Sequence, residues 1–339
     1  MAEYFYISNR RYLGNKYKLT PFIREVVDHH CQNVNTVFDA FAGTGSVAHA
    51  FRDKILYVND LMYSNYLAAL CWFSPQNVRL DYLYSLTDFY NSIDVVNERN
   101  YMSDIFSNTY FSDEVCRRIG FIRDDIQEKY EHGFVNERER AIIITALIYA
   151  MDRIANTCGH YDSFIQGAAF SDDFSLRIPL LDYEPNPMNR CYNQDANLLV
   201  NQIDCDLLYL DPPYNSRQYC DAYHLLENVA LWQKPSVKGV AKKMDRSTMK
   251  SEYCRVTAGD ALSVLVQRAN CRYILLSYNN NGNNLQVRSN AKITDTRILQ
   301  ILSDKGDVRV FEKDFRPFSA GKGQNVGNVE RLFLCVVRR

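Results

Sequence analysis

Thr36-Val37-Phe38-Asp39 runs directly into Ala40-Phe41-Ala42-Gly43-Thr44-Gly45-Ser46. The first four residues have the pattern of a short buried strand, and Ser46 to Arg52 has the spacing of a helix. Glycines between a strand and a helix allow a tight turn and let a ligand approach the backbone closely. The stretch therefore predicts an α/β domain with a ligand site at the turn, although an ordinary glycine turn is the alternative.

Apolar runs elsewhere in the chain extend this strand into a sheet. Ile55–Val58, Asp206–Leu210 and Arg272–Tyr278 are short and have polar ends, which suits parallel strands covered on both faces. Val308–Phe311 and Arg331–Val337 predict two more strands, which would form the antiparallel edge of a mixed sheet.

The stretch from Leu61 to about Arg190 differs from the rest of the chain. Residues 137–155 predict one long helix, and tyrosines and acids are frequent around it. We interpret 61–190 as a helical insertion between two parts of one domain, formed by residues 1–60 and 191–339. No internal repeat is visible.

Composition restricts the class of protein. Of the 339 residues, 47% are apolar and 23% are charged, as in ordinary globular proteins. No apolar run reaches the roughly eighteen residues of a membrane span, and the first residues lack the apolar core of a secretory signal, so we expect a cytosolic protein. The ten cysteines form no C-x-x-C pair, which favours reduced, mostly buried thiols. The six histidines form no metal-binding set, and we expect no metal.

Positive charge is concentrated locally, although the net charge is only −1. One basic stretch runs from Arg10 to Arg24, and a second, from Lys234 to Arg255, includes Lys242, Lys243 and Arg246. A folded chain can place such stretches on one face that meets a phosphate backbone. Solvated surface charge is the alternative, and charge alone does not decide between the two.

An acid follows the second predicted strand at an informative distance. Asp60 comes twenty-one residues after Asp39, where a carboxylate can accept hydrogen bonds from both ribose hydroxyls of a bound nucleotide. A dinucleotide site would be expected to have a third glycine, but Gly43 and Gly45 are followed by Ser46-Val47-Ala48. The pattern therefore favours S-adenosylmethionine, which has no pyrophosphate to bind.

The third predicted strand ends at Asp211-Pro212-Pro213-Tyr214. The two prolines fix the backbone and remove two N–H donors, so the carboxylate of Asp211 and the carbonyl of Pro212 remain as acceptors. A planar exocyclic amino group offers two donors to such a pair, and aligned acceptors stabilise the charge that develops on its nitrogen. Tyr214 can stack on the base. A base inside a duplex cannot reach such a pocket, so base flipping is implied.

These motifs, in this order, resemble the Dam-like, alpha-type group of DNA adenine-N6 methyltransferases, many of which belong to restriction–modification systems. Arg11-Tyr12-Leu13-Gly14-Asn15-Lys16 resembles the group's N-terminal motif, although the Dam subgroup often has tryptophan at the position of Tyr12. Tyr223-His224-Leu225-Leu226-Glu227 also resembles type II members of the group.

The resemblance implies roles for individual residues. Tyr12 and Lys16 would hold the methionine end of the cofactor, with Lys16 on its carboxylate, and Asp195 of Asn193-Gln194-Asp195 would contact the cofactor adenine. Asp211, Pro212, Pro213 and Tyr214 would form the catalytic motif. The full set expected around the cofactor is Tyr12, Gly14, Asn15, Lys16, Asp39, Phe41, Ala42, Gly43, Gly45, Asp60, Asp195 and Asp211.

A polar segment follows the long predicted helix. Asn156, His160 and Tyr161 could contact DNA bases or enter the gap left by a flipped base. An ordinary C-capping turn with a buried, hydrogen-bonded histidine is the alternative.

We therefore expect a seven-stranded, Rossmann-like methyltransferase sheet with a helical target-recognition insertion, and a function in methylating adenine N6 in double-stranded DNA. A restriction endonuclease of the same system would be a partner, in a bacterial or phage-infected cytoplasm. Three alternatives remain: an RNA methyltransferase, a cytosine-amino methyltransferase, which more often has serine in place of Asp211, and a non-catalytic nucleic-acid-binding protein.

Overall fold

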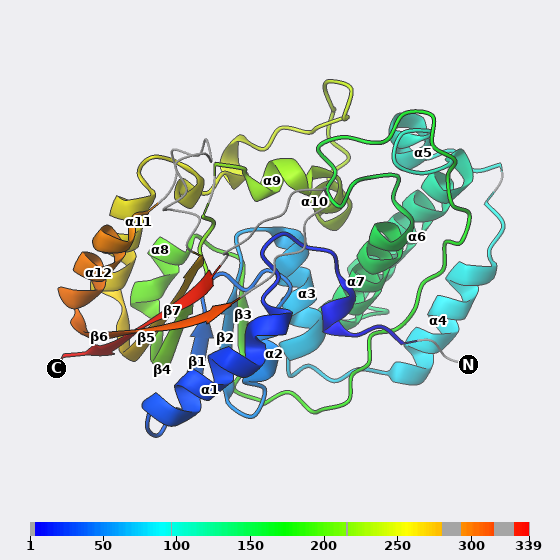
Figure 1. The fold of residues 1–339 in the computed structure, drawn as a ribbon. Helices are drawn as coiled ribbons and strands as arrows, with labels where there is room; N and C mark the ends of the chain where they lie inside the picture. Colours follow the sequence, from blue (N-terminus) through cyan, green and yellow to red (C-terminus); the bar gives the residue numbers. More distant parts are fainter. Residues whose placement is uncertain (1–3, 96, 215, 280–292, 315–328, 339) are drawn as a thin grey trace. The chain divides into compact units, whose positions relative to one another are not determined.

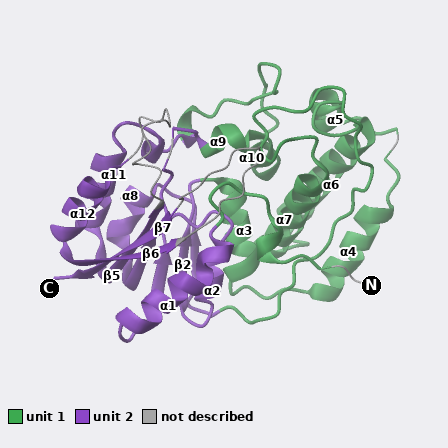
Figure 2. Cartoon of the chain, viewed as in Figure 1, with its two compact units in different colours: residues 1–15, 62–185, 219–248 green, residues 16–61, 186–218, 249–339 purple. Residues whose placement is uncertain are grey.

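The computed structural model describes residues 4–95, 97–214, 216–279, 293–314 and 329–338. The chain forms two compact units, each assembled from three segments (Figure 2). The first unit contains residues 1–15, 62–185 and 219–248. The second contains residues 16–61, 186–218 and 249–339.

A seven-stranded sheet forms the centre of the second unit (Figure 1). Its spatial order is β3-β2-β1-β4-β5-β7-β6. In chain order the strands are β1 (Thr36–Asp39), β2 (Ile55–Asn59), β3 (Arg190–Tyr192), β4 (Asp204–Leu210), β5 (Asn270–Asn279), β6 (Gly306–Asp314) and β7 (Val329–Val337).

The strand directions confirm the mixed sheet that the sequence predicts. β1 to β5 run parallel to one another, whereas β7 is antiparallel to both β5 and β6. Six strands lie where apolar runs predict them. β3 is the strand that the sequence analysis missed, because its three residues begin with the exposed Arg190 and contain no apolar run.

Helices cover both faces of this sheet. Phe38, Leu208 and Ile274 pack on one face in a core with residues of α8, α11 and α12, whereas their chain neighbours Val37 and Leu207 are buried but lie outside that core. α1 and α2 lie on the other side (Figure 1). The bounds are α1 (Thr20–His30), α2 (Ser46–Ala50), α8 (Ala196–Leu199), α11 (Ala258–Arg268) and α12 (Asp295–Ser303). Short 3-10 turns are η2 (Tyr17–Leu19), η3 (Val200–Gln202) and η5 (Glu252–Cys254).

The first unit is helical, and α7 (Glu137–Ile154) is its central element. Every residue of α7 from Arg138 to Met151 is buried, because α3, α4, α6 and α10 all pack against it. The remaining bounds are η1 (Ile7–Asn9), α3 (Tyr63–Phe73), α4 (Leu80–Ser92), α5 (Tyr101–Phe106), α6 (Asp113–Glu131), α9 (Tyr219–Ala222) and α10 (His224–Leu231). The residues of a further turn, η4 (Ser247–Met249), are divided between the two units.

Charged residues at the beginning of α7 are buried and paired. Glu139 accepts hydrogen bonds from the side chain of Arg79 at 2.6 and 2.8 Å and from its backbone N–H at 2.9 Å. Arg138 donates to the carbonyl oxygen of Gln76 at 2.9 Å, and Arg140 donates to the hydroxyl of Tyr63 at 2.8 Å. These bonds offset part of the cost of burying charged side chains in the first turn.

The boundaries of the units differ from the predicted domain boundaries at two places. The units divide the chain at 15/16 and 218/219. Residues 1–15 and 219–248 therefore belong to the unit of the helices, whereas the prediction assigned them to the domain of the sheet.

The ten cysteines are all free, and most are buried. Among the residues that the structure describes, no helix is long and apolar enough to cross a bilayer.

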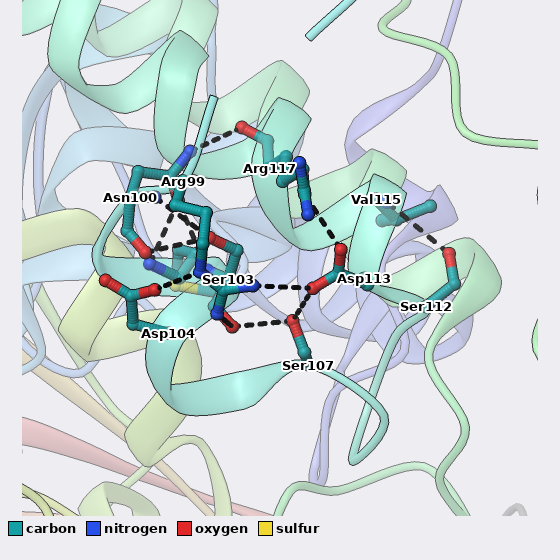
Figure 3. Close-up of polar contacts among 10 residues, drawn as sticks. Arg99, Asn100, Ser103, Asp104, Ser107, Ser112, Asp113, Val115 and Arg117 are labelled. Atoms are coloured by element: carbon teal, nitrogen blue, oxygen red, sulfur yellow. Dashed lines mark hydrogen bonds and ion pairs between the residues drawn. The ribbon is translucent and has the colours of Figure 1, made fainter. Parts of the chain in front are cut away.

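Asn100 joins the beginnings of two helices in the first unit (Figure 3). Its side-chain oxygen accepts from the N–H groups of Met102 and Ser103 at 3.1 and 3.2 Å and thereby caps α5. Its amide group donates to the carbonyl oxygen of Arg117 in α6 at 2.8 Å. A Cβ atom on Gly120 would lie 2.0 Å from the Asn100 side chain, so glycine at 120 makes room for this contact.

We predict that Asn100→Ala lowers the free energy of unfolding by about 1–2 kcal/mol, because α5 loses its cap and the bond to α6 is lost as well. Denaturant unfolding checks this value. Asp104→Asn is the matched control, since Asp104 and its ion-pair partner Arg99 are both more than half exposed and such pairs contribute little. An equal loss in both variants would contradict the cap assignment.

Candidate active site

The glycine turn after β1 has the backbone conformation that its sequence predicts. Gly43 and Gly45 have φ angles of 54° and 81°, in the left-handed region that glycine adopts without strain. The carboxylate of Asp60 accepts a hydrogen bond from the N–H of Gly43 at 2.7 Å. The acid expected to hold a ribose therefore also fixes the turn, and it lies at the carboxyl end of β2 beside the end of β1.

Asn59, the last residue of β2, connects two loops of the site. Its side-chain amide donates to the carbonyl oxygens of Ala40 and Gln194, both at 3.1 Å. Its side-chain oxygen accepts from the N–H of Gln194 at 3.1 Å. Asn59 thus holds the glycine turn and the 193–195 loop at a fixed separation, a role that the sequence analysis did not assign.

Asp39 is a buried carboxyl group among other acids. Burial, together with the nearby carboxylates of Asp211 and Asp60, raises its pKa to about 8, and the N–H groups of Phe41 and Ala48 offset only part of this rise. This group of acids therefore favours a positively charged group near Asp39, since a cation would stabilise the ionised carboxylate.

Lys16 provides a positive charge beside Asp211. Its ammonium lies 3.1 Å from a carboxylate oxygen of Asp211 and 3.0 Å from one of Glu330, and all three side chains are largely buried. Burial alone would lower the pKa of Lys16, but Asp211 and Glu330 raise it well above its usual value. Burial raises the pKa of Asp211 to about 6, although Lys16 lowers it.

Asp211-Pro212-Pro213-Tyr214 follows β4 directly, at the same edge of the sheet as the glycine turn. Pro212 is buried, and Pro213 is partly exposed. The ring of Tyr214 packs edge-on against Tyr278, with centroids 6.4 Å apart, and lies 5.8 Å from the Lys16 ammonium. The ring is thus held beside the carboxylate at the end of the strand.

Asp195 and Phe41 lie in the second unit near a buried tyrosine. Asp195 is exposed and caps α8 by accepting from the N–H of Asn197 at 2.8 Å. The ring of Phe41 meets the ring of Tyr253 edge-on at 5.0 Å. The Tyr253 hydroxyl donates to the side-chain oxygen of Asn197 at 2.8 Å. Burial raises the pKa of Tyr253, and the charge of Asp195 adds to this rise.

The N-terminal motif is divided between the units. Lys16 belongs to the second unit, whereas Tyr12, Gly14 and Asn15 belong to the first. There Tyr12 stacks on Tyr223 with centroids 4.6 Å apart, and its hydroxyl accepts from Asn65 at 2.9 Å. Gly14 has a φ of 77°. The roles of these three residues toward a cofactor stay predictions.

The segment after α7 provides one correction. Tyr161 is 2% exposed, and its hydroxyl donates to Asp152 at 2.9 Å, so this residue does not fit the predicted contact with DNA. Asn156 donates to the carbonyl oxygen of Ile165 at 2.8 Å and thereby holds the following loop. His160 is partly exposed, with Nδ1 lying 3.9 Å from Asp162.

The second basic stretch is partly neutralised within the first unit. Lys243 pairs with Asp162 at 2.6 Å, and Arg246 pairs with Asp221 at 2.7 Å. In the part of the chain that the structure describes, no ion pair involves Lys242. Of the three basic residues predicted to contact DNA, Lys242 is thus the one whose charge is not neutralised by an ion pair among the described residues.

Comparison with known proteins gives one family. Residues 12–285 match the family described as D12 class N6 adenine-specific DNA methyltransferase. The chain is 32% identical to modification methylase StsI of Streptococcus sanguinis over 97% of this chain and 52% of the relative. It is 32% identical to type II methyltransferase M.FokI of Planomicrobium okeanokoites over 96% of this chain and 52% of that relative.

A third relative has a similar length. The chain is 28% identical to type II methyltransferase M.NlaIII of Neisseria lactamica, over 93% of this chain and 94% of the relative. The chain therefore spans about half the length of the first two relatives and nearly all of the third.

We predict that Asp39→Asn stabilises the ligand-free protein, and more at pH 8 than at pH 5. The pKa of Asp39 is about 8 in the folded protein and about 4 in an unfolded chain. The folded state therefore loses stability relative to the unfolded state as the pH rises from 4 to 8, and asparagine removes this loss. We expect a gain of about 2 kcal/mol or more at pH 8, measured by denaturant unfolding at both pH values.

Asp53→Asn is the control for Asp39→Asn. Asp53 is half exposed, and a hydrogen bond from Arg24 lowers its pKa to about 2, so its replacement should give a small loss instead of a gain. An equal gain in stability from Asp39→Asn at pH 5 and pH 8 would show that the pKa of Asp39 is not raised in the folded protein.

Proposed function

The chain belongs to the D12 class N6 adenine-specific DNA methyltransferase family, and from this we propose that it methylates the N6 amino group of a flipped adenine in double-stranded DNA. The observation that carries the proposal is the position of Asp211-Pro212-Pro213-Tyr214. The motif begins where β4 ends, beside the end of β1 and its glycine turn. In an open α/β sheet this edge is where ligands bind.

S-adenosylmethionine is the methyl donor that we propose. The glycine turn lets a ligand approach the backbone, and Asp60 can accept from ribose hydroxyls while it holds Gly43. The cofactor carries a sulfonium and an ammonium group, which fit a pocket where Asp39 and Asp211 are near one another. When bound, it supplies a methyl group that can be transferred to a nucleophilic nitrogen. Phe41, Asp195 and Tyr253 would border its adenine.

The chain's own contribution to the reaction is the placement of acceptors. Asp211 and the Pro212 carbonyl accept hydrogen bonds from the target amino group, which directs its lone pair toward the methyl donor and stabilises the charge that develops on nitrogen. Lys16 helps to keep Asp211 ionised, since it lowers the pKa of that carboxyl group. Tyr214 offers a ring on which the base can stack.

We propose that the helical unit reads the target sequence. Residues 62–185 make up most of the predicted insertion, and 219–248 contain the larger part of the second basic stretch, from Lys234 to Arg246. Phosphate contacts would position the protein on DNA, and base contacts would specify the site. The relatives named modification methylases support a place in a restriction–modification system, with a restriction endonuclease of the same specificity as partner.

The decisive experiment measures methyl transfer from labelled S-adenosylmethionine to unmethylated genomic DNA. Nucleoside analysis and single-molecule mapping then identify the modified base and its surrounding sequence. We expect N6-methyladenine at one short recurring sequence. Methylated RNA but unmethylated DNA would favour an RNA methyltransferase, and cofactor binding without transfer to either would favour a non-catalytic protein.

We predict that Asp211→Ala abolishes this methylation while the fold is largely kept, because one of the two acceptors is lost. Circular dichroism and thermal unfolding check the fold. Asp206→Ala is unsuitable as a control, since Asp206 accepts bonds from the backbone of Asn35 and Thr36. Asp307→Ala on the exposed edge strand β6 is the matched control. Methylation at the wild-type rate by Asp211→Ala would overturn the mechanism.

We predict that Lys242→Ala and Lys243→Ala differ in their effects on DNA binding. Lys242→Ala should weaken binding about equally for all sequences and reduce the slope of log affinity against log salt by about 1, as expected for one lost phosphate contact. Lys243→Ala should instead lower stability, because Asp162 loses its partner. Fluorescence anisotropy at several salt concentrations separates the two. Unchanged salt dependence in Lys242→Ala would remove this residue from the DNA surface.

A further inference from the structure

Glu330 lies in the acid group of the site although no motif of the sequence points to it. It is the second residue of β7, and its backbone is in register with Asn279 of β5. Because β7 runs antiparallel to β5, the beginning of β7 lies at the edge where the parallel strands end. The topology of the sheet thus brings a residue from the last strand to the position of Asp211, which follows β4.

The contacts of Glu330 are short and buried. Its carboxylate lies 3.0 Å from the Lys16 ammonium, and it accepts a hydrogen bond from the Ser277 hydroxyl at 2.8 Å. The same ammonium lies 3.1 Å from Asp211. The side chains of Lys16 and Glu330 are 7% and 5% exposed, and Ser277 is fully buried.

We propose that Glu330 is a positioning residue for methyl transfer, which holds the Lys16 ammonium beside Asp211. The strength of the ion pair between Lys16 and Asp211 then depends on Glu330 when Asp211 accepts a hydrogen bond from the target amino group. This inference rests on the proposed function, since it takes Asp211 as the acceptor for that group. Glu330 itself touches neither the base nor the reacting methyl group in this proposal. It acts through Lys16.

A lysine needs such a second partner to keep one position. Its ammonium is a point charge with three donors on a flexible four-carbon stem, so a single carboxylate would leave it free to move with that carboxylate. Glu330 is fixed by its place on β7 and by the bond from Ser277, and it can therefore hold the ammonium as a second partner in addition to Asp211. The neighbouring Arg331 is occupied elsewhere, because it pairs with Asp295 at the start of α12.

Glu330 also opposes the effect of Lys16 on Asp211. Burial raises the pKa of Asp211 to about 6, Lys16 lowers it and the charge of Glu330 raises it. The other titratable side chains that interact with this group are Asp39 on β1, Tyr209 on β4 and Tyr214 after it. Removal of the Glu330 charge and removal of the Lys16 charge should therefore shift the titration of Asp211 in opposite directions.

The test compares Glu330→Gln, Glu330→Asp and Lys16→Met in the full chain. Single-turnover methylation is measured from pH 5 to pH 9 with saturating S-adenosylmethionine and target DNA. We expect the acidic limb of the profile to move down by about one pH unit in Glu330→Gln and up by about one in Lys16→Met. Glu330→Asp keeps the charge, so its limb should stay near that of the wild type while its maximal rate falls.

Two further measurements keep the inference separate from the proposed function. Carbon NMR of protein with labelled aspartate, assigned with Asp211→Asn, follows the titration of Asp211 without any reaction. Asp307→Asn, which removes an exposed charge from β6, is the control and should leave both profiles unchanged. If Glu330→Gln does not move the Asp211 titration, or moves it in the same direction as Lys16→Met, the positioning role is wrong. If the titrations shift as expected but no variant and no wild type methylates DNA, the proposed function fails instead.

Discussion

Four acids and one lysine meet at the carboxyl edge of the sheet, and the cost of burying their charges governs how the site is built. Asp39, Asp60, Asp211 and Glu330 provide more negative charge than Lys16 can balance. Ions moved from water into a protein lose solvation that must be replaced by partners. Part of the replacement comes from Lys16, and part comes from the N–H of Gly43. The remainder appears as raised pKa values for Asp39 and Asp211, so a cation bound beside these acids would stabilise their ionised forms.

The glycine turn and the acids depend on one another. Gly43 must adopt a positive φ for its N–H to reach the Asp60 carboxylate, and a side chain at that position would be strained. Asn59, one residue before Asp60, bonds the carbonyl oxygen of Ala40 in the same turn. The end of β2 therefore holds the loop after β1 at two points, and the shape of the proposed cofactor site follows from strand pairing as much as from the glycines.

The units divide the chain at informative places. Three of the crossings between units, at 15/16, 61/62 and 218/219, lie within or just after the three motifs that the sequence analysis singled out. Along the chain, Lys16 and Asp60 therefore lie next to or near a segment of the helical unit, and Asp211 precedes such a segment by eight residues. The sequence predicts the helical insertion at 61–190, but it does not predict that residues 1–15 and 219–248 belong to the same unit, because no local pattern in either segment distinguishes it from the segments that form the sheet.

The sequence predicts those features that depend on neighbours along the chain, and it fails where the partner is distant. The strands β1, β2, β4 and β5, the positive φ of Gly43 and Gly45 and the helix α7 all follow from local patterns. β3 has three residues and no such pattern. Tyr161 looks exposed in a polar segment, yet Asp152, nine residues before it, accepts its hydroxyl in the interior.

Glu330 shows the limit most clearly. A single acid at the start of an apolar strand is most simply a surface residue, and nothing near it in the chain suggests otherwise. Its significance arises only when an antiparallel strand places it 3.0 Å from a lysine more than three hundred residues earlier. The charge balance of this site therefore depends on the sheet topology, which brings together residues that are far apart in the sequence. A sequence motif contains only those residues of the site that are close to one another along the chain.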